Sequence, residues 1–247
     1  MHIQSMSSTE TSSKPLVGKV LSRAVKLWLR SQVEQIDTLD LKILGHNRSI
    51  LRGHISQVTV GTSDAVYRGL HLTQVDLCAS DIEINIGQVL KGKPLKLLKS
   101  FPVDCQICLL SADLNTSLQA PLLNNAITKF LLPLIQSQNP NNCNLSFPND
   151  IKSLQNLQII LGQDQLTLTA EIVSTSDELT PFSFHCELYL ASPTELLLAS
   201  PHLELPQQQQ HCDLDNMTID LGTDVNLQQL SISPEQLQIK GEIKVNP

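Results

Sequence analysis

One apolar helix pattern, in a chain that otherwise alternates with period two, limits most strongly what this sequence can fold into. Its apolar residues recur at helical spacing and form one stripe within residues 111–138. The stripe consists of Leu123, Ala126, Ile127, Phe130, Leu131 and Leu134. Pro121 suits the first position of this helix. Ser111 or Asp113 is predicted to be the N-cap of a shorter helical turn before it. Pro133 lies inside the pattern and predicts a kink. This helix needs a sheet to lie on, and the pair encloses either a solid core or a lipid groove.

Most of the remaining chain alternates apolar and polar residues, as strands of a half-buried sheet do. The clearest example is residues 182–190, and similar segments follow one another at hairpin spacing. We therefore predict an antiparallel α+β fold with about a dozen strands and two or three helices. Between residues 70 and 86 the alternation slips twice, which indicates bulges or a bend. The second strand is predicted to span residues 50–60, with a bulge at Gly53.

The first predicted helix covers residues 16–36 and has two contrasting faces. At about 100° per residue, one narrow stripe contains Lys19, Arg23, Lys26 and Arg30. About opposite lie Val17, Leu21, Ala24 and Trp28. A basic amphipathic helix with a tryptophan is typical of an anionic membrane surface, so Trp28 and the four cations are assigned to that surface. The alternative is a helix that packs its apolar face on the sheet and leaves its basic face in water. The two interpretations are compatible if only the basic face of the helix touches lipid headgroups.

Charge and composition exclude several classes of protein. The net charge of −7 and the aromatic content of 3% argue against a nucleic-acid surface of stacked rings. The charge is uneven, at about +4 up to residue 33 and about −11 beyond it. The chain has no run of about 18 apolar residues, so we predict no transmembrane helix.

The first 15 residues are polar and lack the apolar segment of a secretory signal. They predict a disordered tail on a cytoplasmic protein, peripheral at the plasma or thylakoid membrane, and residues 16–247 are expected to form one domain. In a reducing compartment, all six cysteines of the chain are expected to stay thiols. These six are Cys78, Cys105, Cys108, Cys143, Cys186 and Cys212.

No pattern in the sequence predicts a catalytic or metal site. The chain lacks a glycine-rich phosphate loop, a G-x-S-x-G and an H-E-x-x-H. Cys105 and Cys108 form a C-x-x-C in an alternating strand, where positions three apart face opposite sides. His185 and His211 each precede a cysteine, but adjacent strand residues also diverge, so a Cys/His site would need partners from elsewhere. We assign no reaction, no metal and no cofactor other than a bound lipid or another apolar ligand.

Several short motifs, in a fixed order, resemble one protein family. The first two are Leu51-Arg52-Gly53 with Ile55, and Tyr67-Arg68-Gly69-Leu70 with Leu72. The central one is Ala112-Asp113-Leu114-Asn115 with Leu118 and Pro121-Leu122-Leu123. The tail adds Asp220-Leu221-Gly222-Thr223-Asp224-Val225 and Gly241-Glu242-Ile243-Lys244-Val245-Asn246-Pro247. Over residues 16–247 the chain resembles the LmeA-like phospholipid-binding family, in the form that cyanobacteria carry.

The resemblance implies a TULIP-like tubular architecture, in which a strongly twisted antiparallel sheet wraps long amphipathic helices around an apolar groove. It also implies phospholipid binding at a membrane. Such a container is needed because an exposed acyl chain of about 16 carbons costs about 0.8 kcal/mol per CH₂, or more than about 10 kcal/mol. From its pattern, we assign the stripe between Leu123 and Leu134 to this lipid groove.

Two other functions fit the sequence. A structural or adaptor module would use the same apolar residues in a fully packed core and bind a protein partner on its surface. A lipid-acting hydrolase or transferase would need a nucleophile and a base at a groove mouth, and no spacing indicates them. The leading hypothesis is a non-enzymatic phospholipid-binding protein, active in lipid transfer, that docks on anionic membranes.

Overall fold

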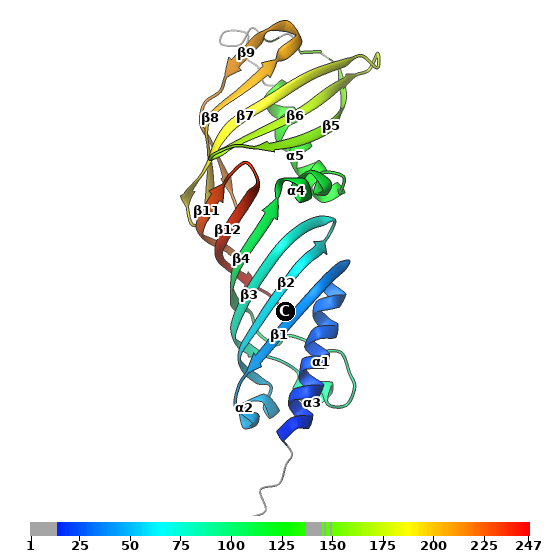
Figure 1. Cartoon of the computed structure of the whole chain (residues 1–247), viewed down its shortest axis with the longest axis vertical. Coiled ribbons are helices and arrows are strands. Elements are labelled where there is room, and N and C mark those ends of the chain that lie inside the picture. The colour runs from blue at the N-terminus through cyan, green and yellow to red at the C-terminus, as the bar shows by residue number, and fades with distance from the viewer. Residues whose placement is uncertain (1–13, 137–144, 146, 149) are drawn as a thin grey trace, which may run out of the picture.

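Two open antiparallel sheets of six strands each form most of the structure (Figure 1). The computed structural model describes residues 14–136, 145, 147–148 and 150–247. The first sheet has the spatial order β1 (Gln35–Leu44), β2 (His54–Tyr67), β3 (Leu70–Glu83), β4 (Phe101–Leu110), β12 (Gln236–Val245) and β11 (Val225–Ile232). The second has the order β10 (Met217–Asp220), β8 (Glu195–Leu205), β7 (Leu179–Ser192), β6 (Gln165–Ser174) and β5 (Ile151–Leu161), and β9 (Gln210–Asp213) also pairs with β8. The predicted antiparallel α+β fold is therefore confirmed.

The helices divide between the two sheets. They are α1 (Lys14–Gln32), α2 (Asn47–Leu51), α3 (Ile86–Val89), α4 (Ser111–Ser117) and α5 (Pro121–Gln136), with a 3₁₀ turn, η1, at Pro206–Gln208. In Figure 1 the sheets follow each other along an elongated molecule, with α1 beside β1 and with α4 and α5 beside the second sheet. Each sheet therefore has its own long helix.

The first sheet has irregular backbone where the alternation slips. Asp81, at the second slip, takes a left-handed conformation with a φ of 52°. The first slip lies opposite Asp64, whose φ is 50°. Positive φ at a non-glycine residue within a strand marks a local break in strand geometry. The backbone of β3 is therefore irregular at the second predicted slip. The register between β2 and β3 has no shift at either slip, so the prediction of bulges is wrong there.

The core consists of two apolar clusters, one for each sheet. Leu21 of α1 belongs to the first cluster, and Leu131 of α5 belongs to the second. Strand β4 reaches both, because its Val103 packs in the first cluster and its Leu109 packs in the second. Side chains two apart on a strand share a face, so one face of β4 connects the two cores.

Helix α4 begins one residue after β4 ends, without a side-chain cap. Leu110 takes the N-cap position, so the prediction of Ser111 or Asp113 at this position is wrong. The Asp113 carboxylate is engaged elsewhere, since it accepts a hydrogen bond from Thr73 Oγ1 at 2.5 Å. This bond attaches α4 to β3 of the first sheet.

Asn115 of the same helix attaches α4 to the second sheet. Its Nδ2 donates to the carbonyl oxygen of Ile159 at 2.8 Å, and its Oδ1 accepts from the Ile159 N–H at 2.9 Å. Ile159 lies on β5, which is the edge strand of that sheet. The side-chain amide therefore satisfies edge backbone groups as a neighbouring strand would.

Two predicted boundaries at the first strands are wrong. Helix α1 ends at Gln32 rather than at residue 36, because β1 already begins at Gln35. Residues 50–51 belong to α2, and β2 begins only at His54. Gly53 lies in the turn between them with a φ of 89°, where a Cβ would lie 2.4 Å from the Ile84 carbonyl oxygen. Gly53 is therefore required for a close backbone approach, not for a bulge.

Predictions for the tail and the cysteines have different outcomes. The predicted disordered tail falls outside the described residues, except that α1 already begins at Lys14.

Cys212 takes part in a disulfide, so the prediction that every cysteine stays a thiol is wrong for this residue. That prediction rested on the expected compartment rather than on the position of the side chain. The free thiols are Cys78, Cys105, Cys108 and Cys186.

Candidate lipid-binding surfaces

Helix α1 packs its apolar face on the first sheet and exposes its basic face. Leu21 and Val25 are buried in the first cluster, and Trp28 is half-buried against it. The predicted cations are all exposed: Lys19, Arg23, Lys26 and Arg30. The predicted packing of this helix is confirmed, and it leaves the basic face open to a ligand. None of the helices in the described residues is both long enough and apolar enough to cross a membrane.

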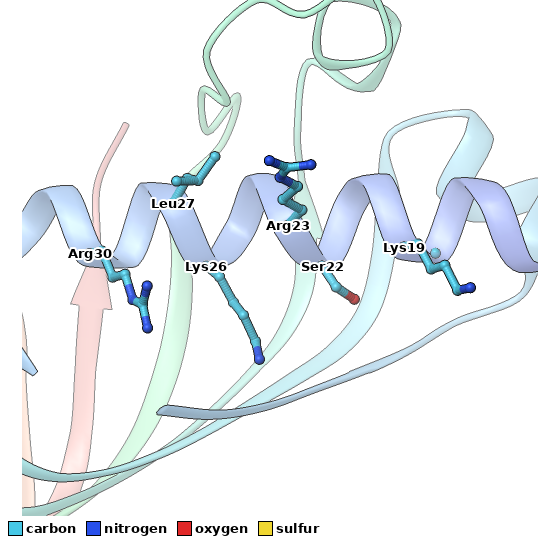
Figure 2. A pocket seen from close by; sticks show the side chains of 7 residues that line it. Lys19, Ser22, Arg23, Lys26, Leu27 and Arg30 are labelled. Atoms are coloured by element: carbon cyan, nitrogen blue, oxygen red, sulfur yellow. The ribbon is translucent and has the colours of Figure 1, made fainter. Parts of the chain in front are cut away.

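An open recess of about 580 Å³ lies along this basic face. It is lined by Gly18, Lys19, Ser22, Arg23, Lys26, Leu27 and Arg30. Figure 2 shows Lys19, Lys26 and Arg30 extending to one side of the helix, whereas Arg23 extends to the other. Positive charge therefore borders the recess on both sides.

No acidic side chain of the described residues forms an ion pair with these four cations. Lysines elsewhere do have such partners. Lys152 Nζ, for example, lies 2.8 Å from Asp177 Oδ1. The charge on α1 is therefore available to an external anion, and phosphate oxygens are strong acceptors for lysine and arginine.

Helix α5 buries its predicted stripe to different degrees. Leu131 is 0% exposed and belongs to the second cluster. Half-buried against that cluster are Leu123, Ile127, Phe130 and Leu134. Ala126 is exposed, because it lies at the edge of the stripe. The stripe thus faces the second sheet and keeps part of its apolar surface accessible.

Contacts of α5 with the sheet include side chains that the sequence did not single out. The Phe130 ring meets the Phe184 ring of β7 edge to face, with centroids 5.6 Å apart. Ile135 is only 2% exposed and packs in the same cluster. It lies four positions after Leu131, so extending the i, i+4 pattern by one step would have included it.

The two predicted surfaces lie in different halves of the molecule, with α1 on the first sheet and α5 on the second (Figure 1). Besides the recess on α1, an open recess of about 590 Å³ lies on the polar face of the first sheet, near Asp40, Asp76 and Asp104. Two further open recesses also lie on the first sheet. None of these four recesses is lined by a residue of α5. The groove assignment therefore rests on half-buried side chains rather than on a preformed cavity.

The C-x-x-C cysteines face opposite sides of β4, as predicted. Cys105 is buried on the inner face, whereas the Cys108 thiol donates to Gln236 Oε1 at 3.2 Å. Burial raises the pKa of both thiols, so both are protonated at neutral pH. Separated and protonated, they do not form a metal or redox pair with each other.

Comparison with known families identifies the chain. Residues 16–242 match the family model described as LmeA-like phospholipid-binding. Curated proteins yield no match, and neither do solved structures. The match covers the span of the resemblance except residues 243–247, so most of the last motif lies beyond it. The chain therefore belongs to the LmeA-like phospholipid-binding family.

Proposed function

We propose that this protein is a non-enzymatic phospholipid carrier that docks peripherally on anionic membranes through the basic face of α1. Four exposed cations carry this proposal, because no acidic side chain of the described residues neutralises them. Family membership supports a phospholipid as the ligand. Since the chain as a whole has a charge of −7, attraction to an anionic surface requires a local and oriented patch of this kind.

The electrostatic attraction is sufficient for reversible docking. Each lysine or arginine near an anionic bilayer contributes about 1 kcal/mol, so four contribute about 4 kcal/mol. That energy corresponds to a dissociation constant of about 1 mM. The attraction falls off over a Debye length of about 10 Å at 0.1 M salt, so docking is expected to weaken as salt rises. Weak, salt-sensitive docking suits a carrier that must leave the membrane with its cargo.

We place the acyl chains against α5, in a TULIP-like arrangement of helix and sheet. Its half-buried side chains support this placement, because they keep apolar surface that a hydrocarbon can cover. Entry of a chain requires α5 to move away from the second sheet, since the recesses described above lie elsewhere. An aliphatic wall binds by area, so selectivity among acyl chains is expected to be loose.

Charge reversal tests the docking. The variant carries Lys19→Glu, Arg23→Glu, Lys26→Glu and Arg30→Glu. It should lose cosedimentation with vesicles that contain phosphatidylglycerol. A control variant makes the same change in net charge by reversing other exposed lysines: Lys129, Lys152, Lys240 and Lys244. The control should retain binding, because the patch and not the net charge is proposed to matter. Equal binding by both variants, with unchanged circular dichroism, would remove α1 from the proposal.

A polar substitution in the stripe tests the acyl-chain site. Ile127→Asn should reduce both copurifying lipid, measured by native mass spectrometry, and uptake of fluorescent phospholipid from vesicles. Leu122→Asn is the matched control on the same helix, because Leu122 is 44% exposed. Repeated absence of lipid from the unmodified protein, together with no uptake, would contradict the carrier function.

A structural or adaptor module is the second candidate, and the packing of α5 favours it. Leu131 and Ile135 are almost completely buried, and Phe130 contacts Phe184 directly. Such a core needs no ligand. This candidate predicts a protein that never copurifies with lipid and that binds one protein partner at a fixed stoichiometry.

The redox state of Cys212 depends on the compartment in which the protein acts. We propose the cytoplasmic face of a membrane. The disulfide at Cys212 is typical of oxidising compartments instead. The redox state of Cys212 in cells therefore tests the compartment without testing lipid binding.

A further inference from the structure

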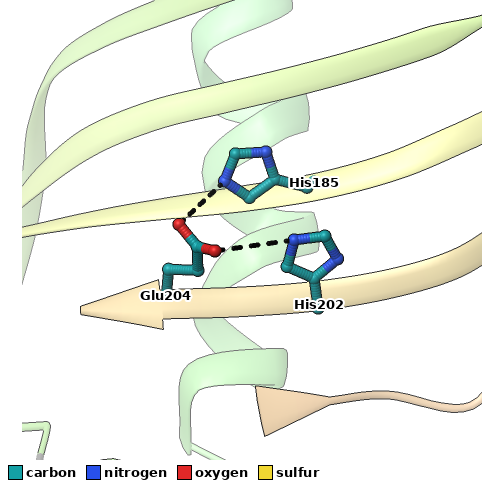
Figure 3. Close-up of side chains that lie close together, drawn as sticks. All are labelled: His185, His202 and Glu204. Atoms are coloured by element: carbon teal, nitrogen blue, oxygen red, sulfur yellow. Dashed lines mark ion pairs between the residues drawn. The ribbon is translucent and has the colours of Figure 1, made fainter. Parts of the chain in front are cut away.

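Three side chains with metal-binding atoms converge on the outer face of the second sheet (Figure 3). His185 lies on β7, and His202 and Glu204 lie on β8. His185 Nε2 lies 3.4 Å from Glu204 Oε2, and His202 Nε2 lies 3.8 Å from Glu204 Oε1. One ligand atom from each residue lies within 4.8 Å of the other two. All three side chains are half-buried.

Strand register explains why these residues meet. His185 and His202 are direct cross-strand partners, and their rings stack with centroids 4.6 Å apart. Glu204 follows His202 by two positions, so both point to the same face of β8. Their sequence neighbours Phe184 and Leu203 point the other way and are 0% exposed. Burial of Phe184 and Leu203 therefore keeps the side chains of His185, His202 and Glu204 on the outer face of the sheet.

The second nitrogen of each imidazole lies near an oxygen. His185 Nδ1 lies 2.9 Å from Thr167 Oγ1, and His202 Nδ1 lies 3.4 Å from the carbonyl oxygen of Ser200. Histidines that bind metals commonly donate their second N–H to such an oxygen, which fixes the tautomer. With the proton on Nδ1, each Nε2 has a lone pair for a metal ion, and both Nε2 atoms lie near the Glu204 carboxylate. His185 Nε2 also lies 2.9 Å from Ser183 Oγ, a hydrogen bond that a metal ion would replace.

We propose that His185, His202 and Glu204 bind one divalent transition-metal ion, with zinc as the best match. Two imidazole nitrogens and one carboxylate form a ligand set that zinc accepts. Bonds of 2.0–2.2 Å in a tetrahedron place the ligand atoms about 3.3 Å apart. The two nitrogen–oxygen separations of 3.4 and 3.8 Å are close to this value, and the ligand atoms of the whole cluster lie within 4.8 Å of one another, so they must move closer together around an ion. The two rings are stacked with only 10° between their planes, so both must tilt substantially before their lone pairs meet at one ion. The terminal torsion of histidine is soft enough to allow this movement.

The site would join β7 to β8. Three protein ligands leave a fourth tetrahedral position for water or another side chain. On β9, His211 pairs with Glu204 and Asp213 pairs with His202, so both lie beside the cluster. The cluster is on the opposite face of the sheet from α5, and the inference does not depend on the proposed lipid function.

Titration of the metal-stripped protein with zinc chloride tests the site. Isothermal calorimetry should give one equivalent of zinc per chain, and zinc should raise the unfolding temperature, because the three ligands assemble only in the folded sheet. His202→Ala and Glu204→Gln should each abolish the stoichiometric site. Thr167→Val, which removes only the oxygen beside His185 Nδ1, should weaken binding by about tenfold.

The control is His46→Ala, which removes an exposed histidine far along the chain from the cluster and should bind zinc as the unmodified protein does. Circular dichroism verifies that each variant is folded, and Glu204→Gln keeps the shape of the side chain if His202→Ala does not fold. Equal zinc binding by Glu204→Gln and by the unmodified protein would overturn the inference, and so would the absence of zinc binding by the unmodified protein.

Discussion

Gly69 lies at the tip of the β2–β3 hairpin, where a side chain would prevent docking on the helices. Arg68 and Gly69 have φ values of 51° and 77°, as a two-residue turn of type I′ requires. A Cβ on Gly69 would lie 2.3 Å from the Cβ of Ala120, between α4 and α5. The hairpin can therefore approach the helices only because residue 69 has no side chain.

We predict that Gly69→Ala lowers the free energy of unfolding by about 2 kcal/mol or more, since steric overlap adds to the cost of a positive φ. Gly92→Ala is the matched control, because Gly92 has a φ of 78° and no atom within 4 Å of the added Cβ. It should cost about 1 kcal/mol. Urea unfolding measures both values. Equal losses would show that the contact with Ala120 contributes nothing.

The cysteine thiols are expected to differ in reactivity according to their burial. Burial raises the pKa of the Cys186 thiol to about 11, so at pH 8 only about one thiol in a thousand is ionised. Iodoacetamide should modify half-buried Cys78 first and leave Cys186 unmodified in the native protein, as measured by peptide mass spectrometry. Cys212 should react only after reduction and unfolding. Its alkylation without a reductant would contradict the disulfide and favour the cytoplasmic side.

Among the helices, α1 has the clearest division between a packed face and an open face. Trp28 is the single tryptophan of the chain and packs against the first cluster. If only the basic face meets lipid headgroups, Trp28 keeps its surroundings on docking. We predict that its emission maximum and its quenching by acrylamide stay unchanged when phosphatidylglycerol vesicles bind the protein. A blue shift with reduced quenching would instead indicate that α1 leaves the sheet and inserts its apolar face.

Helix α4 connects the two sheets through Asn115, and this connection can be broken by one substitution. Asn115→Ala removes the partner of the Ile159 N–H and C=O, so we predict a loss of about 1–3 kcal/mol in unfolding free energy. Asn125→Ala, at an exposed position of α5, should change it by less than about 0.5 kcal/mol. Hydrogen exchange checks the mechanism, because the Ile159 amide should lose protection only in the first variant.

The whole molecule is elongated and has two apolar clusters, yet β4 and α4 belong to both halves. We therefore propose that residues 16–247 unfold as one unit. Leu131→Ala in the second cluster and Ile55→Ala in the first should each lower stability by about 2–5 kcal/mol. Both should shift one common transition in urea, followed by circular dichroism and by Trp28 emission. Two transitions, each sensitive to one variant only, would show that the halves fold separately.

At the scale of the whole chain, local pattern accounts for part of this structure. Alternation over residues 182–190 and the apolar stripe of α5 specified a strand and a helix correctly, because both periods involve near neighbours. The slip at Asp81 was visible for the same reason. Ile50 was misassigned, because one apolar residue suits a strand and a helical turn equally well.

Sequence alone established the family, the antiparallel α+β class and the two faces of α1, since motif order and periodicity can be read along the chain. Pairing of β4 with β12, the contact between Phe130 and Phe184, and the meeting of His185 with Glu204 became evident only in the folded molecule. These features depend on contacts between residues far apart in sequence. Such contacts are set by how whole elements pack, and no local pattern encodes that packing.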